Sequence, residues 1–85
     1  MYIRLTSRFR RELKKMPVEL RELINERVDH FINDPFKTVL KTHKLSGKFK
    51  GHWAFSIDYK HRIIFEFIED YALFHSIGDH SIYDY

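Results

Sequence analysis

WAFSIDYKHRIIFEFIEDYALFHSI, residues 53–77, is the stretch of sequence that decides the fold. Apolar residues alternate with smaller or polar residues in three runs, which is typical of strands with one buried face. The segments 59–61 and 69–70 between the runs have the composition of turns. Short turns between alternating runs predict three consecutive antiparallel strands, with Leu73 and Ile77 pointing inward from the third.

Two helices are predicted upstream of these strands. Thr6 or Ser7 is a suitable N-cap for the first helix, because its side-chain oxygen can accept from a free backbone N–H. Pro17 fits the first turn of the second helix, and the segment 33–35 (Asn-Asp-Pro) ends it, since the residue before a proline avoids the helical region. The apolar positions that repeat at helical spacing are Leu5, Phe9, Leu13 and Met16, then Leu20, Leu23, Ile24, Val28, Phe31 and Ile32.

The predicted fold class is α+β, in the order β-α-α-β-β-β. Residues 1–5 alternate and form the first short strand, and an additional short strand is possible within residues 43–50. We expect the helical hairpin to pack on one face of an antiparallel sheet. No linker or repeat divides the sequence, so residues 1–85 are expected to form a single domain.

The composition excludes several classes of site. The chain has no cysteine, which rules out disulfides, thiol catalysis and thiolate metal ligands. It has six histidines but no close pair such as H-x₃-H, so we expect no metal and no other cofactor. No apolar run is long enough to cross a membrane, and no signal peptide is apparent, which favours the cytoplasm.

Positive charge is concentrated in the first part of the chain. Residues 1–50 hold thirteen Lys/Arg against six Asp/Glu, a net of +7, whereas residues 51–85 hold two against six, a net of −4. A basic segment suggests a polyanionic partner, because lysine and arginine that neutralise phosphates release counterions. The alternative is a solvated, basic helix face that binds nothing.

Three motifs in the second half of the chain resemble those of a known family. HKLSGKFKGHW (residues 43–53) resembles the H-x-L-x-G-x-x-x-G-x-W/Y stretch of RelE- and YafQ-like toxins, from the RelE/ParE superfamily. RIIF (62–65) resembles the Y-R-I-I-F/Y strand of that superfamily, and IGDHSIY (77–83) resembles its terminal I/V-G-T/D-H-D-x-Y motif. The resemblance implies the RelE-like fold.

The resemblance also implies a function. Members of the family are toxins of type II toxin–antitoxin systems that typically cleave mRNA on the ribosome, and a cognate antitoxin neutralises them. The expected partners are therefore an antitoxin, mRNA and the ribosome, with no membrane. Two alternatives stay open: a ParE-like toxin that is not a nuclease, and a decayed homologue that acts through protein binding.

Metal-free RNA cleavage needs a base for the 2′-OH, positive charge on the phosphate and an acid for the leaving oxygen. The resemblance places a catalytic histidine at His80, although a solvated surface histidine is the alternative. Arg62 alternates out of phase with Ile63, so it leaves the core face and could bind the phosphate. The alternative role for Arg62 is a cross-strand ion pair with Glu66 or Asp58.

Other candidates complete the predicted site. His43 could act as a second base or bind phosphate, or make a structural hydrogen bond at the start of a strand. Tyr83 could stack on a base or help activate the 2′-OH, or pack on the sheet. Three further residues could contact phosphates along the approach to the site, and they are Lys48, Lys50 and His52.

The sequence departs from the family in two places. Lys60-His61 stand where YafQ-like enzymes have Asp-Trp, and Ser76 stands where they have arginine. The catalytic set of neither RelE nor YafQ is therefore complete. The roles of His61 and His75 stay open.

Overall fold

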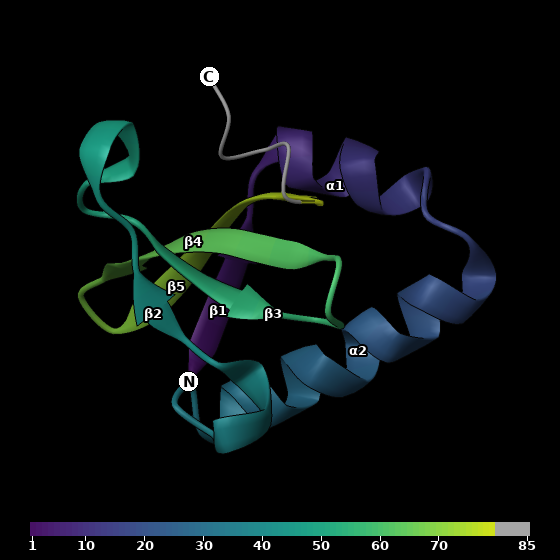
Figure 1. The fold of residues 1–85 in the computed structure, drawn as a ribbon, viewed down its shortest axis with the longest axis horizontal. Coiled ribbons are helices and arrows are strands. Elements are labelled where there is room, and N and C mark those ends of the chain that lie inside the picture. The colour runs from purple at the N-terminus through teal and green to yellow at the C-terminus, as the bar shows by residue number, and fades with distance from the viewer. Residues whose placement is uncertain (80–85) are drawn as a thin grey trace.

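A computed structural model describes residues 1–79 of the chain (Figure 1). The expected order of elements is confirmed, and the additional short strand is present. The elements are β1 (Tyr2–Leu5), α1 (Ser7–Lys14), α2 (Val18–Asn33), the 3₁₀ turn η1 (Thr38–Leu40), β2 (His43–Lys44), the 3₁₀ turn η2 (Gly47–Phe49), β3 (Trp53–Ser56), β4 (Arg62–Ile68) and β5 (Tyr71–Gly78).

The five strands form one mixed sheet in the order β1-β5-β4-β3-β2. Neighbours from β2 to β5 pair antiparallel, as expected. The first strand departs from the predicted antiparallel sheet, because β1 runs parallel to β5, with Tyr2 opposite Tyr71 and Leu5 opposite Phe74. A parallel pair requires a long crossover rather than a hairpin, and here α1, α2 and the rest of the sheet all intervene between the two strands.

The helix boundaries follow the predicted signals closely. Thr6 is the N-cap of α1, and its hydroxyl accepts a hydrogen bond from the backbone N–H of Phe9 at 3.0 Å. Pro17 is the N-cap of α2, one position before the expected first turn, and Asp34 is its C-cap. Within residues 1–79, neither helix is long and apolar enough to span a membrane.

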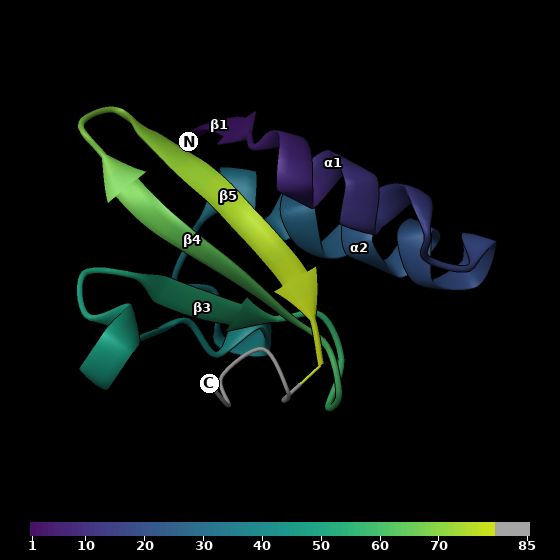
Figure 2. The same ribbon diagram turned by 90° about the horizontal axis from the view of Figure 1, so that it is seen from above.

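Both helices cover the same face of the sheet, and the core lies between them and the strands (Figure 2). Phe31 of α2 is fully buried at its centre. Its ring stacks on Phe55 with 4.7 Å between centroids and meets Phe65 and Phe74 edge-on at 4.9 and 5.3 Å. Aromatic packing of this kind lets a short chain bury a large apolar area.

A β-bulge interrupts β5 at His75. Ile64 of β4 lies opposite Ser76 and the next residue, Phe65, lies opposite Phe74, so His75 has no directly opposite partner. One extra residue changes which side chains face inward. The prediction for Ile77 is therefore confirmed, whereas that for Leu73 is wrong: the inward residues before the bulge are Ala72 and Phe74.

Candidate functional site

The sheet face away from the helices carries two of the predicted site residues. Residues directly opposite one another in an antiparallel pair share a face. Ile63 and Phe65 belong to the core under the helices, so Arg62 and its neighbours across the sheet, Ser56 and Gly78, face the other way. By the same rule, His43 faces this outer side through its pairing with Ala54.

His43 lies exposed at the start of β2. Its Nδ1 is 2.9 Å from the backbone carbonyl oxygen of Lys41. Because a carbonyl can only accept, Nδ1 carries the proton and the neutral ring presents Nε2 as its basic nitrogen. Lys41 adopts a left-handed conformation, with φ 52° and ψ 40°. The structural hydrogen bond foreseen as an alternative is thus present, and it also fixes which nitrogen can accept a proton.

Arg62 is held by the turn between β3 and β4. Its Nη1 donates to the backbone carbonyls of Asp58 at 2.7 Å and His61 at 3.1 Å. The ion pair with Glu66 or Asp58, considered from the sequence, is not among the ion pairs of the described residues. Both bonds use Nη1. The N–H groups at Nε and Nη2 of the guanidinium therefore donate to no other residue among those described.

The same turn contains an aspartate–histidine pair. Asp58 Oδ1 accepts from the backbone N–H groups of Lys60 at 2.9 Å and His61 at 2.7 Å, and it lies 3.1 Å from His61 Nδ1. Desolvation on its own raises the pKa of the Asp58 carboxyl, but the hydrogen bonds and the charge of His61 together lower it below its usual value. The carboxylate holds His61 Nδ1 as the donor, so Nε2 is the ring nitrogen that can exchange a proton.

The basic segment around η2 stands clear of the sheet (Figure 1). Lys48 and Lys50 are both exposed, as expected for residues that contact phosphates. A hollow of about 690 Å³ lies against this segment, with Lys50, His52, Trp53 and Phe67 in its wall. The wall of the hollow therefore combines apolar side chains with lysines.

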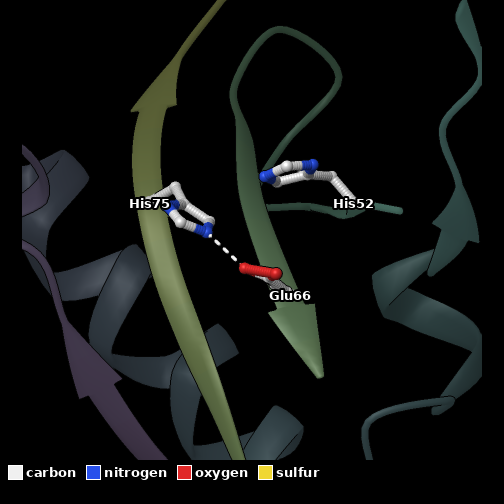
Figure 3. Close-up of side chains that lie close together, drawn as sticks. All are labelled: His52, Glu66 and His75. Carbon is white, nitrogen blue, oxygen red and sulfur yellow. Dashed lines mark hydrogen bonds and ion pairs between the residues drawn. The ribbon is translucent and has the colours of Figure 1, made fainter. Parts of the chain in front are cut away.

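His52, Glu66 and His75 converge on the sheet (Figure 3). His75 Nε2 lies 2.9 Å from Glu66 Oε1, which joins β5 to β4. The His52 ring lies 4.9 Å from the His75 ring, centroid to centroid. All three side chains are partly buried.

The comparisons with known proteins identify the fold. No protein-family model matches the chain, and no curated protein matches its sequence. YafQ from E. coli strain BL21(DE3) superposes with a TM-score of 0.78 at 18% identity, over 98% of this chain and 97% of YafQ. A YoeB/ParE toxin from Agrobacterium tumefaciens superposes with a TM-score of 0.78 at 19% identity, over 94% of this chain and 99% of that toxin. A chain of the toxin–antitoxin complex RelBE2 from Mycobacterium tuberculosis superposes with a TM-score of 0.77 at 16% identity, over 92% of this chain and 95% of that chain.

This chain has the RelE/YafQ-like toxin fold. In this fold, His43 and Arg62 lie on the sheet face away from the helices. His52 lies two residues before Ala54, the partner of His43, and beside Glu66 and His75. His80 and Tyr83 lie outside the described residues, although the last residue of β5, Gly78, is directly opposite Arg62.

The sequence did not single out Asp58, Glu66 or His75 as site residues. The spacing Asp58-x-x-His61 across a turn is a signal that could have indicated the first pair, because aspartate commonly accepts from backbone N–H groups two and three residues on. No comparable signal exists for Glu66 and His75. Their meeting depends on the bulge within the RelE/YafQ-like sheet, which the alternation of the sequence does not reveal.

Proposed function

We propose that residues 1–85 act as a single toxin domain of a type II toxin–antitoxin pair, an endoribonuclease that cleaves mRNA on the ribosome without a metal. The observation that carries this proposal is the fold match, which spans nearly the whole of this chain and of three toxins or toxin complexes. The placement of His43 and Arg62 on the same sheet face, away from the helices, supports it.

His43 is suited to act as the base. Its Nδ1–H is committed to the Lys41 carbonyl, so Nε2 can take the proton of a ribose 2′-OH. The left-handed backbone at Lys41 is a strained conformation for a residue other than glycine, and such strain is often found at functional sites. The exposure of the ring leaves room for a nucleotide beside it.

Arg62 is suited to bind the scissile phosphate. The two turn carbonyls fix the guanidinium through Nη1, and its other donors can face two phosphate oxygens in the planar geometry that arginine offers. His43 and Arg62 lie two strands and two residues apart, on the order of 12 Å between Cα atoms from ordinary strand spacings. Two long side chains can reach one phosphodiester across that distance.

The reaction would then proceed by attack of the 2′-oxygen on phosphorus. The bond to the 5′-oxygen breaks, Arg62 stabilises the charge on the phosphorane-like transition state, and an acid protonates the leaving oxygen. We assign the acid to His80, with Tyr83 stacking on a base or assisting the 2′-OH. Lys48 and Lys50, with His52 nearby, would guide the RNA backbone toward this face.

The departures from the YafQ pattern shift one role in this proposal. The position of the YafQ Asp-Trp pair is occupied by Lys60-His61, but His61 is paired with Asp58 instead. An imidazole whose Nδ1 is held by a carboxylate has the arrangement of a general base or acid. His61 immediately precedes Arg62 in the turn, and we assign it as a second proton carrier at the edge of the proposed site. Ser76 lies on the face away from the helices, where it is buried and supplies no charge.

The proposal includes a cognate antitoxin and a cytoplasmic location. One of the similar structures is a toxin–antitoxin complex, which supports a protein partner that covers the toxin. The basic surface of residues 1–50 is a suitable counterpart for an acidic antitoxin segment as well as for RNA. Ribosomes and mRNA are in the cytoplasm, where such a toxin would act.

The test is induced expression followed by primer extension on cellular mRNA. We expect growth arrest and discrete cleavage sites with the wild type, and loss of both with His80→Ala, Arg62→Ala or His43→Ala. His30→Ala, on α2, is the matched control and should behave as the wild type. The variants are checked for folding by circular dichroism.

Two outcomes would replace the nuclease proposal. Full toxicity of the His80→Ala and Arg62→Ala variants, without mRNA cleavage, would indicate a ParE-like toxin that binds a protein target. Absence of growth arrest with the wild type would indicate a decayed homologue that acts through protein binding. Isolation of an mRNA-free complex with a small neighbouring-gene product would still support the antitoxin partner.

A further inference from the structure

We propose that His52, Glu66 and His75 form a binding site for a divalent transition-metal ion, with Zn²⁺ as the best-matched ion. The sequence alone predicted no metal, because no two histidines have the spacing of a metal motif. The sheet nevertheless brings together a residue that precedes β3, one on β4 and one on β5 (Figure 3). The three residues differ from the nuclease residues His43 and Arg62, although Glu66 lies on the same sheet face as Arg62, and the site does not depend on the proposed function.

The distances are close to those of a metal site. One ligand atom from each of the three residues lies within 4.8 Å of the other two. Ligands bound to tetrahedral zinc at about 2.0–2.1 Å lie about 3.3 Å from one another. His75 Nε2 and Glu66 Oε1 are 2.9 Å apart, a hydrogen-bond distance that has to widen by about 0.4 Å to match two zinc ligands. The His52 ring has to move toward them by up to about 1.5 Å, which is within the reach of a side-chain rotation.

The His52 ring gives an independent sign of a missing ligand. Its Nδ1 is buried and has no hydrogen-bond partner among the described residues. A buried polar atom without a partner is unfavourable, and native structures hold few of them. Coordination of a cation by this imidazole would offset that cost. The ring also lies against the His75 ring, so a metal ion near both would give the two imidazoles a common partner.

The chemistry of the donors selects the type of ion. Two imidazole nitrogens and one carboxylate oxygen suit Zn²⁺ and similar ions rather than Mg²⁺ or Ca²⁺, which prefer oxygen ligands. A set of two histidines and one glutamate with an open fourth position is found in catalytic zinc sites. In this chain, the metal would take the place of the proton now shared by His75 Nε2 and Glu66 Oε1.

The open position of the ion is expected to take an anion. His52 also forms part of the wall of the hollow beside η2, and that wall includes Lys44 and Lys50. These two cations disfavour a bare metal ion but favour an anionic fourth ligand, such as a phosphate oxygen, once the metal is bound. Water is the fourth ligand when no anion is present.

The experiment is a titration of the purified, chelator-treated full-length chain with ZnCl₂ by isothermal titration calorimetry. We expect one Zn²⁺ per chain, with at least tenfold weaker binding in His52→Gln, Glu66→Gln and His75→Gln. Glu66→Gln keeps an oxygen that can accept from His75, so it tests the metal ligand with little disturbance of the fold. Co²⁺ as a second probe should give the visible absorption of a tetrahedral site in the wild type only.

His30→Gln and His43→Gln are the matched controls, since both remove a histidine outside the cluster. Both controls should bind Zn²⁺ as the wild type does. The proposal is overturned if the wild type binds no Zn²⁺ at millimolar concentration, in which case Glu66 and His75 form a cross-strand ion pair only. It is also overturned if His75→Gln and Glu66→Gln, folded by circular dichroism, bind Zn²⁺ as tightly as the wild type.

Discussion

Glu12 of α1 accepts a hydrogen bond at Oε1 from the backbone N–H of Ile77 in β5, at 2.9 Å. The two residues are 65 positions apart in the chain, and the bond joins the helix to the strand just after the bulge at His75. A bulge leaves a backbone group outside the regular ladder. The carboxylate of Glu12 supplies the partner that this group requires, so the helix stabilises the irregular part of the strand.

Glu12→Ala should therefore destabilise the fold, by about 1–3 kcal/mol, because a partly buried N–H loses an ionised partner. Glu12→Gln keeps a carbonyl oxygen at the same position and should cost less. The free energy of unfolding from urea titration gives the comparison. Glu22→Ala, at an exposed position of α2, is the control; an equal loss in Glu22→Ala would show that the effect is not specific to Ile77.

Thr6 provides a second link to the same bulge. Its hydroxyl donates to the carbonyl of His75 at 2.8 Å and accepts from the N–H of Phe9, so one atom both caps α1 and holds β5. Thr6→Ala should lose about 1–2 kcal/mol, whereas Thr6→Ser keeps the hydroxyl and should stay close to the wild type. Thermal unfolding of the two variants tests this. Equal melting temperatures would mean that the hydroxyl contributes nothing.

The turn before Arg62 should give stability a specific pH dependence. Because folding lowers the pKa of Asp58, its ionised form stabilises the protein above the unfolded value of about 3.9, and this stabilisation is lost as pH falls through the folded value. Asp58→Asn removes the charge but keeps an oxygen that can accept from Lys60 and His61. We expect it to be less stable by about 1 kcal/mol at neutral pH, since the group is partly exposed.

The stability difference between wild type and Asp58→Asn should shrink below about pH 4, when the wild-type carboxyl is protonated as well. Urea titrations at a series of pH values between neutral and acidic give this curve. Asp70→Asn, in the exposed turn between β4 and β5, serves as the control. A difference that stays constant across the whole range would contradict the assignment.

The centre of the core should depend strongly on Phe31. Its ring contacts three other phenylalanines, and Phe31→Ala would leave a cavity that costs about 3–5 kcal/mol. A domain of this size has a total stability of only about 5–15 kcal/mol, so the variant should unfold at much lower urea. Ile32→Ala changes the next residue, which is 38% exposed, and should cost less than about 1 kcal/mol. Similar losses in both variants would refute this view of the core.

The sequence was sufficient to predict most of the elements. Alternation and short turns set the antiparallel strands β3 to β5, because neighbouring strands joined by tight turns have few other ways to pair. Local chemistry set the ends of the helices, at Thr6 and at Asn33-Asp34-Pro35. These features depend on residues that are close in sequence.

Features that depend on distant residues were not predicted. β1 pairs in parallel with β5 across nearly the whole chain, and the bulge at His75 is held by Thr6 and Glu12. The simple alternation of β5 therefore assigned Leu73 to the wrong face. The cluster of His52, Glu66 and His75 could not be predicted for the same reason, since its members meet only when the bulged strand is paired.

Arg62 has two tasks in the proposed nuclease, and substitution with lysine should separate them. Nη1 holds the carbonyls of Asp58 and His61, while the remaining donors are assigned to the phosphate. A lysine ammonium can satisfy the turn carbonyls or the phosphate but cannot match both through a planar fork. Arg62→Lys should therefore unfold at nearly the wild-type urea concentration yet cleave RNA more slowly, on the order of 100-fold in a single turnover.

Arg62→Ala should lose both cleavage and about 1–2 kcal/mol of stability. If Arg62→Lys cleaves RNA at the wild-type rate in the same ribosome-containing assay, the arginine contributes only positive charge, and the two-point contact with the phosphate is wrong.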